Sequence, residues 1–511
     1  MKKTLAFLIA LMLGLGATVG ALAEITYPIS DEKIELTVWG VNTLSDYVVD
    51  LNETPFYQAL EEATGVHVNF IHPNSSNLQE QFNLLMFADK LPDIIYGGNL
   101  YTGGPFQGVA DNVFVNLADY LPEYAPDYWK IITANDNIYR EASNAEGVIA
   151  IFGRMKLAMD PPFHRMVLKQ EMLDELGIEI PQTIDEVEVM FAKMLEKGIT
   201  PFMIAKNGLE ANLMGVYDVV NGFQKDENGK VSWGMIAPGF KDYLTLMHKW
   251  YDLGYISKDF ANQANTNTMF DNGEIGTYYN AIVATYNRGQ RYGATIVAAP
   301  YLRLNDTQKL HWEDTQYGNF IYNSESDYVV ITTSCENIEA ACKWMNYRYT
   351  QEGADLCNWG VEGLNYNVVD GQKVYNDLML KNEKFTPEQA SYYYKMHLGA
   401  KLAEPDVVCH ANLLASEGAR ASRMRWADCD YIDKEYVLPP LSYTSEQNAR
   451  RTEIMTEINT YMNEMVLKFI IGTESLDNYD AYVENVKKMG IDEAIQIVQD
   501  AYDAYMAITM K

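Results

Sequence analysis

The sequence predicts an α/β fold built on a parallel β-sheet. Two helical segments, 54–64 and 78–88, separate three short strand-like segments, 34–39, 66–71 and 93–96. Strand and helix alternate in the order β-α-β-α-β, and such a run forms parallel strands joined by right-handed crossovers. With 48% hydrophobic residues in 511, the chain has enough apolar material for more than one packed core.

The boundaries of these elements follow from local signals. Apolar Ile34, Leu36 and Val38 alternate with polar residues, which is typical of a strand with one buried face. Thr54 before Pro55 predicts a helix start, since threonine caps the free amides and proline fits the first turn. Gly65 predicts the end of the same helix.

The carboxyl ends of the predicted parallel strands are candidate ligand positions, because crevices open there in such sheets. Trp39 and Gly40 end the first strand, and Tyr96, Gly97 and Asn99 lie at the end of the third. We take Trp39, Tyr96 and Asn99 as candidate ligand contacts. The alternative is that Trp39 packs under a helix and that the glycines form an ordinary turn.

A second α/β region begins near residue 150. Helices are expected over 169–176 and 183–197, and strands over 201–205, 276–280 and 295–299. Tyr278 and Tyr279, on the strand 276–280, are further candidate ligand contacts.

A glycine-containing block near residue 360 offers an aromatic face beside polar groups. Trp359, Glu362 and Tyr366 lie within eight residues of each other, with Gly360 and Gly363 between them. A sugar has an apolar C–H face ringed by hydroxyls, so an indole beside a carboxylate and a phenol suits it. Alternatively, Trp359 is a core residue and 366–375 is a tight hairpin turning at Asp370-Gly371.

The last forty residues predict two helices, near 475–489 and 491–505, separated by Gly490. Apolar and tyrosine side chains recur at spacings of three and four, which indicates a packing stripe rather than a ligand cage.

The N-terminus has the pattern of an export signal. Two lysines precede the apolar run 5–19, and Ala21 and Ala23 form a small-x-small cleavage site before Glu24. We expect residues 1–23 to be a signal peptide and the protein to be periplasmic or extracellular. No lipid-anchor cysteine follows the site. Five cysteines lie between 335 and 429, and the sequence leaves open two disulfides or buried free thiols.

Charge and motifs exclude several function classes. The net charge is −31, which disfavours nucleic acid as a partner. Phosphate-loop, metalloprotease and nucleophile-elbow motifs are missing, so we predict no catalytic residues, no metal and no cofactor. Arg420, Arg423 and Arg425 either form surface ion pairs or hold an anionic group of a ligand.

Taken in order, several segments resemble the family 1 extracellular solute-binding proteins of ABC importers, especially the long branch that binds oligosaccharides. The segments that carry the resemblance are 92–98, 173–186, 250–260, 272–276, 359–371 and 468–472, with 489–490. Two departures are visible. The usual Arg-Lys-Asp-Trp is replaced at 168–172 by Leu-Lys-Gln-Glu-Met, and no Asp/Asn/Gly-rich calcium loop occurs between Glu186 and Ala205.

The resemblance implies a type II periplasmic-binding-protein-like fold, with two α/β lobes, a hinge and a ligand cleft between the lobes. The expected division is 24–150 and 322–405 for lobe 1, and 151–321 and 406–511 for lobe 2. It further implies a non-enzymatic, monomeric protein that delivers carbohydrate to a permease driven by a separate ATPase. The alternatives are a secreted polysaccharide-degrading enzyme and a sensory sugar-binding protein.

Overall fold

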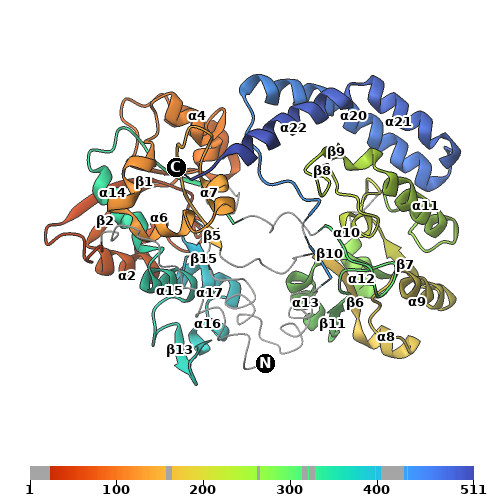
Figure 1. The fold of residues 1–511 in the computed structure, drawn as a ribbon. Coiled ribbons are helices and arrows are strands. Elements are labelled where there is room, and N and C mark those ends of the chain that lie inside the picture. Colours follow the sequence, from red (N-terminus) through yellow and green to blue (C-terminus); the bar gives the residue numbers. More distant parts are fainter. Residues whose placement is uncertain are drawn as a thin grey trace.

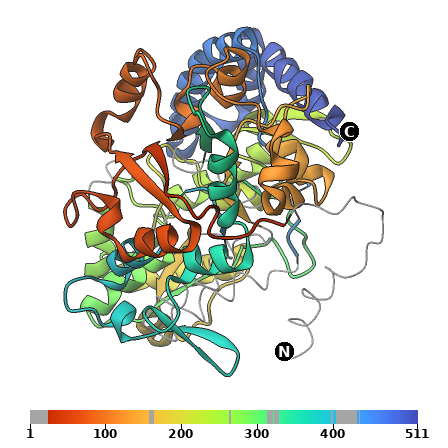
Figure 2. The same cartoon turned by 90° about the vertical axis from the view of Figure 1, so that its left-hand side faces the viewer.

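In a computed structural model the chain forms two α/β lobes side by side (Figure 1), and the second view places the first lobe in front (Figure 2). The structure describes residues 24–156, 164–261, 265–312, 320–321, 328–396, 399–403, 431–433 and 435–510. The expected signal peptide, Cys409, Cys429 and the arginines of 420–425 lie outside these ranges.

The first lobe is built on a five-stranded sheet with the order β2-β1-β3-β12-β4. Strands β1 (Ile34–Trp39), β2 (Val66–Ile71) and β3 (Ile94–Tyr96) are parallel, as predicted. Strand β12 (Tyr328–Ile331) is antiparallel to β3, and β4 (Phe152–Gly153) is antiparallel to β12. The chain therefore returns to this sheet after a long excursion through the second lobe.

Helices cover both faces of the first sheet (Figure 1). Helix α2 (Pro55–Thr64) begins after the Thr54 cap and ends at Gly65 in the left-handed conformation, as the sequence predicts. The other helices of this lobe are α3 (Leu78–Leu85), α4 (Gly104–Ala110), α5 (Leu121–Tyr124), α6 (Pro126–Ile132), α7 (Asp136–Ala142), α14 (Ile338–Tyr347), α15 (Gln351–Trp359), α16 (Asp377–Leu380) and α17 (Pro387–Tyr394).

The second lobe holds a mixed four-stranded sheet with the order β11-β6-β10-β7. Strands β7 (Thr200–Met203), β10 (Ile275–Ala281) and β11 (Ile296–Ala298) lie where the sequence predicts strands. Strand β6 (His164–Lys169) was not predicted. Lys169, expected to start a helix, ends this strand, and α8 follows it.

Helices and a small hairpin complete the second lobe. They are α8 (Gln170–Leu176), α9 (Ile184–Glu196), α10 (Ala211–Gly215), β8 (Phe223–Lys225), β9 (Val231–Trp233), α11 (Pro238–Asp252), α12 (Thr266–Asn272), α13 (Ile282–Arg291), α20 (Ser445–Ile471), α21 (Tyr479–Lys488) and α22 (Ile491–Ala507). The predicted tyrosine stripe is packing, since Tyr479 and Tyr482 belong to the second-lobe core. The C-terminal end reaches the other lobe, where Arg140 Nε donates to the Ile508 carbonyl at 3.0 Å.

Three chain crossings meet between the lobes. Strand β5 (Met155–Lys156) pairs in parallel with β15 (Leu402–Ala403), and the Met155 amide donates to the Lys401 carbonyl at 2.8 Å. Met155 also forms a bridge to Ile321. Because β4 and Met155 belong to the first sheet and core, the first lobe extends past the boundary predicted at residue 150.

The hairpin predicted near residue 370 is present. Strands β13 (Tyr366–Val369) and β14 (Gln372–Tyr375) are antiparallel, and Asp370 and Gly371 both have positive φ. This is the turn that a two-residue hairpin needs. Cys335, Cys342 and Cys357 are buried free thiols.

Candidate functional site

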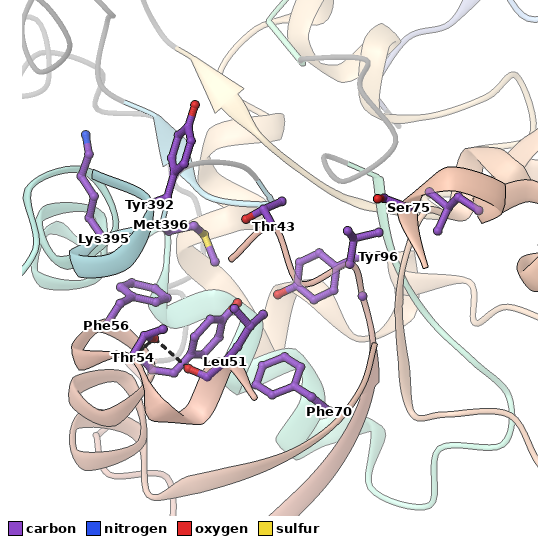
Figure 3. A pocket seen from close by; sticks show the side chains of 14 residues that line it. Thr43, Leu51, Thr54, Phe56, Phe70, Ser75, Tyr96, Tyr392, Lys395 and Met396 are labelled. Atoms are coloured by element: carbon purple, nitrogen blue, oxygen red, sulfur yellow. Dashed lines mark hydrogen bonds between the residues drawn. The ribbon is translucent and has the colours of Figure 1, made fainter. Parts of the chain in front are cut away.

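A cavity of about 250 Å³ opens at the carboxyl ends of β1 and β3 in the first lobe (Figure 3). This edge of the sheet is where ligands bind in parallel α/β folds. The cavity is lined by Gly40, Val41, Thr43, Leu51, Thr54, Phe56, Tyr57, Phe70, Ser75, Leu78, Tyr96, Tyr392, Lys395 and Met396.

The loop after β1 is held in place by its own side chains. Asn42 Nδ2 donates to the Val48 carbonyl at 3.0 Å, and its Oδ1 accepts from the Leu44 amide at 2.8 Å. Gly40 allows close approach, because a Cβ there would lie 3.3 Å from Tyr96 Cδ2. Hydrogen bonds within the loop therefore fix the position of this wall of the cavity.

The N-terminal turn of α2 supplies an aromatic wall. Thr54 Oγ1 donates to the Leu51 carbonyl at 2.7 Å (Figure 3) and accepts from the Tyr57 amide at 3.4 Å. The ring of Tyr57 packs edge-to-face on Phe56 and on Phe70, with centroid distances of 4.9 Å in both pairs. The helix cap thereby fixes the ring that lines the cavity.

The opposite wall comes from the end of α17, more than three hundred residues later in the chain. The Met396 amide donates to the Cys357 carbonyl at 3.2 Å, and Lys395 Nζ donates to the Asn358 carbonyl at 3.0 Å. Both contacts tie this wall to α15.

Tyr57 and Tyr96, two of the three tyrosines that line the cavity, remain protonated near neutral pH. Burial raises the pKa of Tyr57 and of Tyr96, and the positive charge of Arg348 opposes the rise in both. The Tyr96 hydroxyl is buried and has no hydrogen-bond partner among the residues that the structure describes. It points toward the other lining side chains (Figure 3). An unpaired hydroxyl in a cavity is a ready donor and acceptor for a polar ligand.

Tyr96 is the one sequence-predicted candidate among the lining residues. Trp39 ends β1 as expected but is 3% exposed, belongs to the first-lobe core and packs edge-to-face on Phe82 at 5.8 Å. Asn99 follows β3, and no donor from the described part of the chain reaches its buried Oδ1. Trp39 therefore packs in the core of the first lobe, as in the alternative interpretation of the sequence.

The Trp359 block forms a separate small core. Trp359 ends α15, is 1% exposed, and lies 4.8 Å from the Tyr375 ring and 5.8 Å from the Tyr366 ring. Tyr366 is buried in the same cluster, whereas Glu362 is exposed on the turn before the hairpin. The expected stacking surface of Trp359 therefore faces the hairpin's own tyrosines, because the hairpin folds back over the helix end.

Tyr278 and Tyr279 lie in the second lobe. The Tyr278 hydroxyl donates to Asn267 Oδ1 at 2.6 Å and accepts from Asn280 and from Arg288, each at 2.7 Å. Tyr279 packs on Phe202, with ring centroids 6.1 Å apart. The predicted candidates are thus divided among the cavity, the cores of both lobes, the Trp359 cluster, an exposed turn and a second-lobe polar network.

Sequence reasoning missed most of the cavity, including Thr43, Tyr57, Tyr392 and Met396. Tyr57 lies in the first helical turn after the predicted Thr54 cap, and Tyr392 belongs to a run of three tyrosines. Either signal would have marked an aromatic surface, but neither shows that the two segments meet.

Within the described residues, one group could offer three donors to a cation. His311 Nδ1 lies 3.0 Å from Asp433 Oδ1 and 3.7 Å from Glu435 Oε2. His311 hydrogen-bonds Asp433 at the surface, and Asp433 and Glu435 are exposed, as acidic groups without a bound ion commonly are.

Comparison with known proteins matches residues 52–355 to the bacterial extracellular solute-binding protein family. The chain belongs to this family. The family consists of binding proteins rather than enzymes. Within the described residues, no helix is both long and apolar enough to cross a membrane.

The relatives of this solute-binding protein match it over most of its length. The fructooligosaccharide ABC transporter substrate-binding protein FusA of Streptococcus pneumoniae serotype 4 is 23% identical, over 95% of this chain and 93% of FusA. The polygalacturonan/rhamnogalacturonan-binding protein YtcQ of Bacillus subtilis is 18% identical, over 87% of each chain.

Solved structures show the same fold. FusA in complex with kestose superimposes with a TM-score of 0.67 at 18% identity, covering 93% of this chain and all of FusA. The alginate-binding protein AlgQ2 superimposes with a TM-score of 0.66 at 22% identity, covering 93% of this chain and 99% of AlgQ2. The predicted two-lobed, type II periplasmic-binding-protein fold is confirmed.

Proposed function

We propose that this protein is the extracytoplasmic carbohydrate-binding component of an ABC importer. It binds a saccharide between its lobes and delivers it, as a monomer, to a permease served by a separate ATPase. The observation that supports this most directly is the first-lobe cavity, which combines aromatic faces with the unpaired hydroxyl of Tyr96. Sugars need both kinds of surface.

The size of the cavity suits part of a saccharide rather than a whole chain. At about 250 Å³ it is slightly smaller than typical small-molecule sites of roughly 300–1,000 Å³. One sugar residue would occupy it, and the rest of an oligosaccharide would extend toward the second lobe. The crossing segments next to the cavity support this arrangement, since Met396 lies five residues before Lys401 of the three-way crossing.

A thermal-shift screen of the purified protein against mono- and oligosaccharides tests the proposal. A ligand at 100 times its Kd stabilises the native state by about 2.7 kcal/mol. Hits are then titrated calorimetrically, and each ligand is recovered afterwards. We expect saturable binding and intact ligand. Release of shorter products would favour the polysaccharide-degrading enzyme, and no binding by any saccharide would refute the proposal.

A pair of variants tests whether the cavity is the site. Tyr96→Phe removes only the unpaired hydroxyl and is expected to weaken binding about tenfold, as the loss of one buried hydrogen bond does. Tyr292→Phe makes the same chemical change on a side chain that is 66% exposed in the second lobe. It should bind like the native protein. Equal affinity of both variants would place the site elsewhere.

A further inference from the structure

The last helix of the chain is anchored in the second lobe. Helix α22 places Ile491 and Ala494 in the second-lobe core. Farther along, the Val231 amide of the β8–β9 hairpin donates to Gln499 Oε1 at 2.8 Å, and Gln499 Nε2 donates to the Gly229 carbonyl at 3.2 Å. Most of α22 therefore moves with the second lobe.

Directly after α22 the chain reaches the first lobe. Ile508 packs against the first-lobe core, and its carbonyl accepts from Arg140 Nε at 3.0 Å. Arg140 lies on α7, and its side chain is 11% exposed. Its Nη1 also donates to Asn137 Oδ1 at 3.1 Å, which holds the guanidinium in position. An apolar contact and a hydrogen bond thus join the two lobes at this point.

The helix that receives this contact also holds a chain crossing. Helix α7 belongs to the first-lobe core through Ile138 and Ala142. Glu141 Oε2 accepts at 2.9 Å from the amide of Ile321, the residue that bridges to Met155 between the lobes. When the second lobe rotates about the crossings, α7 therefore stays with the first lobe, whereas α22 does not.

The contact of Ile508 and the cavity lie on opposite sides of the crossings. In Figure 1 the C-terminal end and α22 lie above the crossing strands β5 and β15, whereas α17, which supplies a wall of the cavity, lies below them. Within the described ranges, the residues that line the cavity all belong to the first lobe, so the second lobe stands away from it in this arrangement. Two bodies that rotate about a hinge approach on one side of it and separate on the other. Closing the lobes over the cavity therefore pulls Ile508 away from α7.

We propose that the end of α22 is a latch, in which the contact of Ile508 with Arg140 and the first-lobe core holds the lobes apart and is released when they close over a saccharide. This inference rests on the proposed carbohydrate-binding function. It adds a regulatory element to that function, because the latch sets the affinity from a position outside the cavity.

The latch has a definite consequence for affinity. A ligand that needs the closed arrangement binds with an apparent Kd equal to its intrinsic Kd divided by the closed fraction. Contacts that exist only in the open arrangement lower that fraction. Removing such a contact therefore tightens binding. This sign distinguishes a latch from packing that only supports the fold, because loss of such packing leaves affinity unchanged or weakens it.

The test titrates latch variants calorimetrically with the saccharide that gives the native protein its largest thermal shift in the screen described above. Ile508→Glu places a charge against the first-lobe core and should bind this saccharide about tenfold more tightly, and Ile508→Ala about threefold. Arg140→Met keeps the stem but removes the donor, and it should tighten binding about threefold. Met506→Ala is the matched control, because this side chain near the end of α22 is 45% exposed. It should bind like the native protein.

A double-mutant cycle shows whether Ile508 and Arg140 act through the same contact. The tightening in Arg140→Met combined with Ile508→Glu should fall short of the product of the two single effects. Arg450→Met is the second control, since the Arg450 guanidinium pairs with Glu493 and Glu453 within the second lobe. It should leave affinity unchanged and combine independently with Ile508→Glu.

The failure of this inference differs from the failure of the proposed function. Unchanged or weaker binding by Ile508→Glu, in a protein with a native-like thermal melt, refutes the latch and leaves carbohydrate binding intact. If Ile508→Glu does not fold, Ile508→Ala decides by the same criterion. Absence of binding by every saccharide refutes the proposed function, and the latch with it.

Discussion

The first prediction decides whether Trp359 packs in a small core or stacks on a sugar. Its indole is 1% exposed and packs on the rings of Tyr375 and Tyr366 at 4.8 and 5.8 Å. Trp359→Ala removes this contact from a small core that the hairpin covers. Large-to-small core changes of this kind cost roughly 3–5 kcal/mol. We therefore expect a clear loss of stability, with unchanged affinity of the protein that remains folded.

The assay combines denaturant unfolding with calorimetric titration of a saccharide found in the screen. Val368→Ala is the control, since Val368 lies on the same hairpin but is 50% exposed. It should change the free energy of unfolding by no more than about 0.5 kcal/mol. An unchanged unfolding midpoint for Trp359→Ala together with a tenfold loss of affinity would refute the packing role and support stacking on a sugar.

Three further predictions concern other parts of the molecule. Burial raises the pKa of Glu210 to about 8, so the folded protein keeps a proton that the unfolded chain loses near pH 4.5. The free energy of unfolding should therefore fall between pH 4.5 and 8 by up to about 5 kcal/mol. In Glu210→Gln, urea unfolding should show a free energy of unfolding that depends less on pH over this range. N-terminal sequencing of the exported protein should start at Glu24, and an intact N-terminus would refute the signal peptide. Solution scattering should show a smaller radius of gyration at saturating ligand, whereas an unchanged radius would argue against closure of the lobes.

Elements with strong local signals could be predicted from the sequence, and elements defined by burial could not. Helix α2 has a threonine cap and a glycine stop, and both termini were predicted correctly. Strand β6 is buried on both sides over its four central residues, so it lacks the alternation that marks a half-buried strand. Its apolar run is only Met166 to Leu168, beside the buried Arg165, and so short a run does not distinguish strand from helix.

The candidate site was harder to predict because its walls are distant in the chain. The carboxyl ends of β1 and β3 were expected to meet, and Gly40 and Tyr96 do line the cavity. Tyr392 and Met396 reach the same cavity only through the packing of α17 near α2. Trp359 illustrates the opposite difficulty. A tryptophan is a residue type suited to sugar binding, but the sequence does not show that the hairpin folds back and covers its ring.

The position of the cavity within one lobe limits which contacts can drive closure. A ligand shifts a conformational equilibrium only by its difference in affinity for the two states. Under the proposed function, contacts with Tyr57, Tyr96 and Met396 exist before and after the lobes move, because all three belong to the first lobe. These first-lobe contacts contribute to affinity but do not favour the closed state over the open state. Contacts with the second lobe must therefore supply the free energy that favours the closed state, so first-lobe variants such as Tyr96→Phe should weaken binding without preventing compaction at saturation.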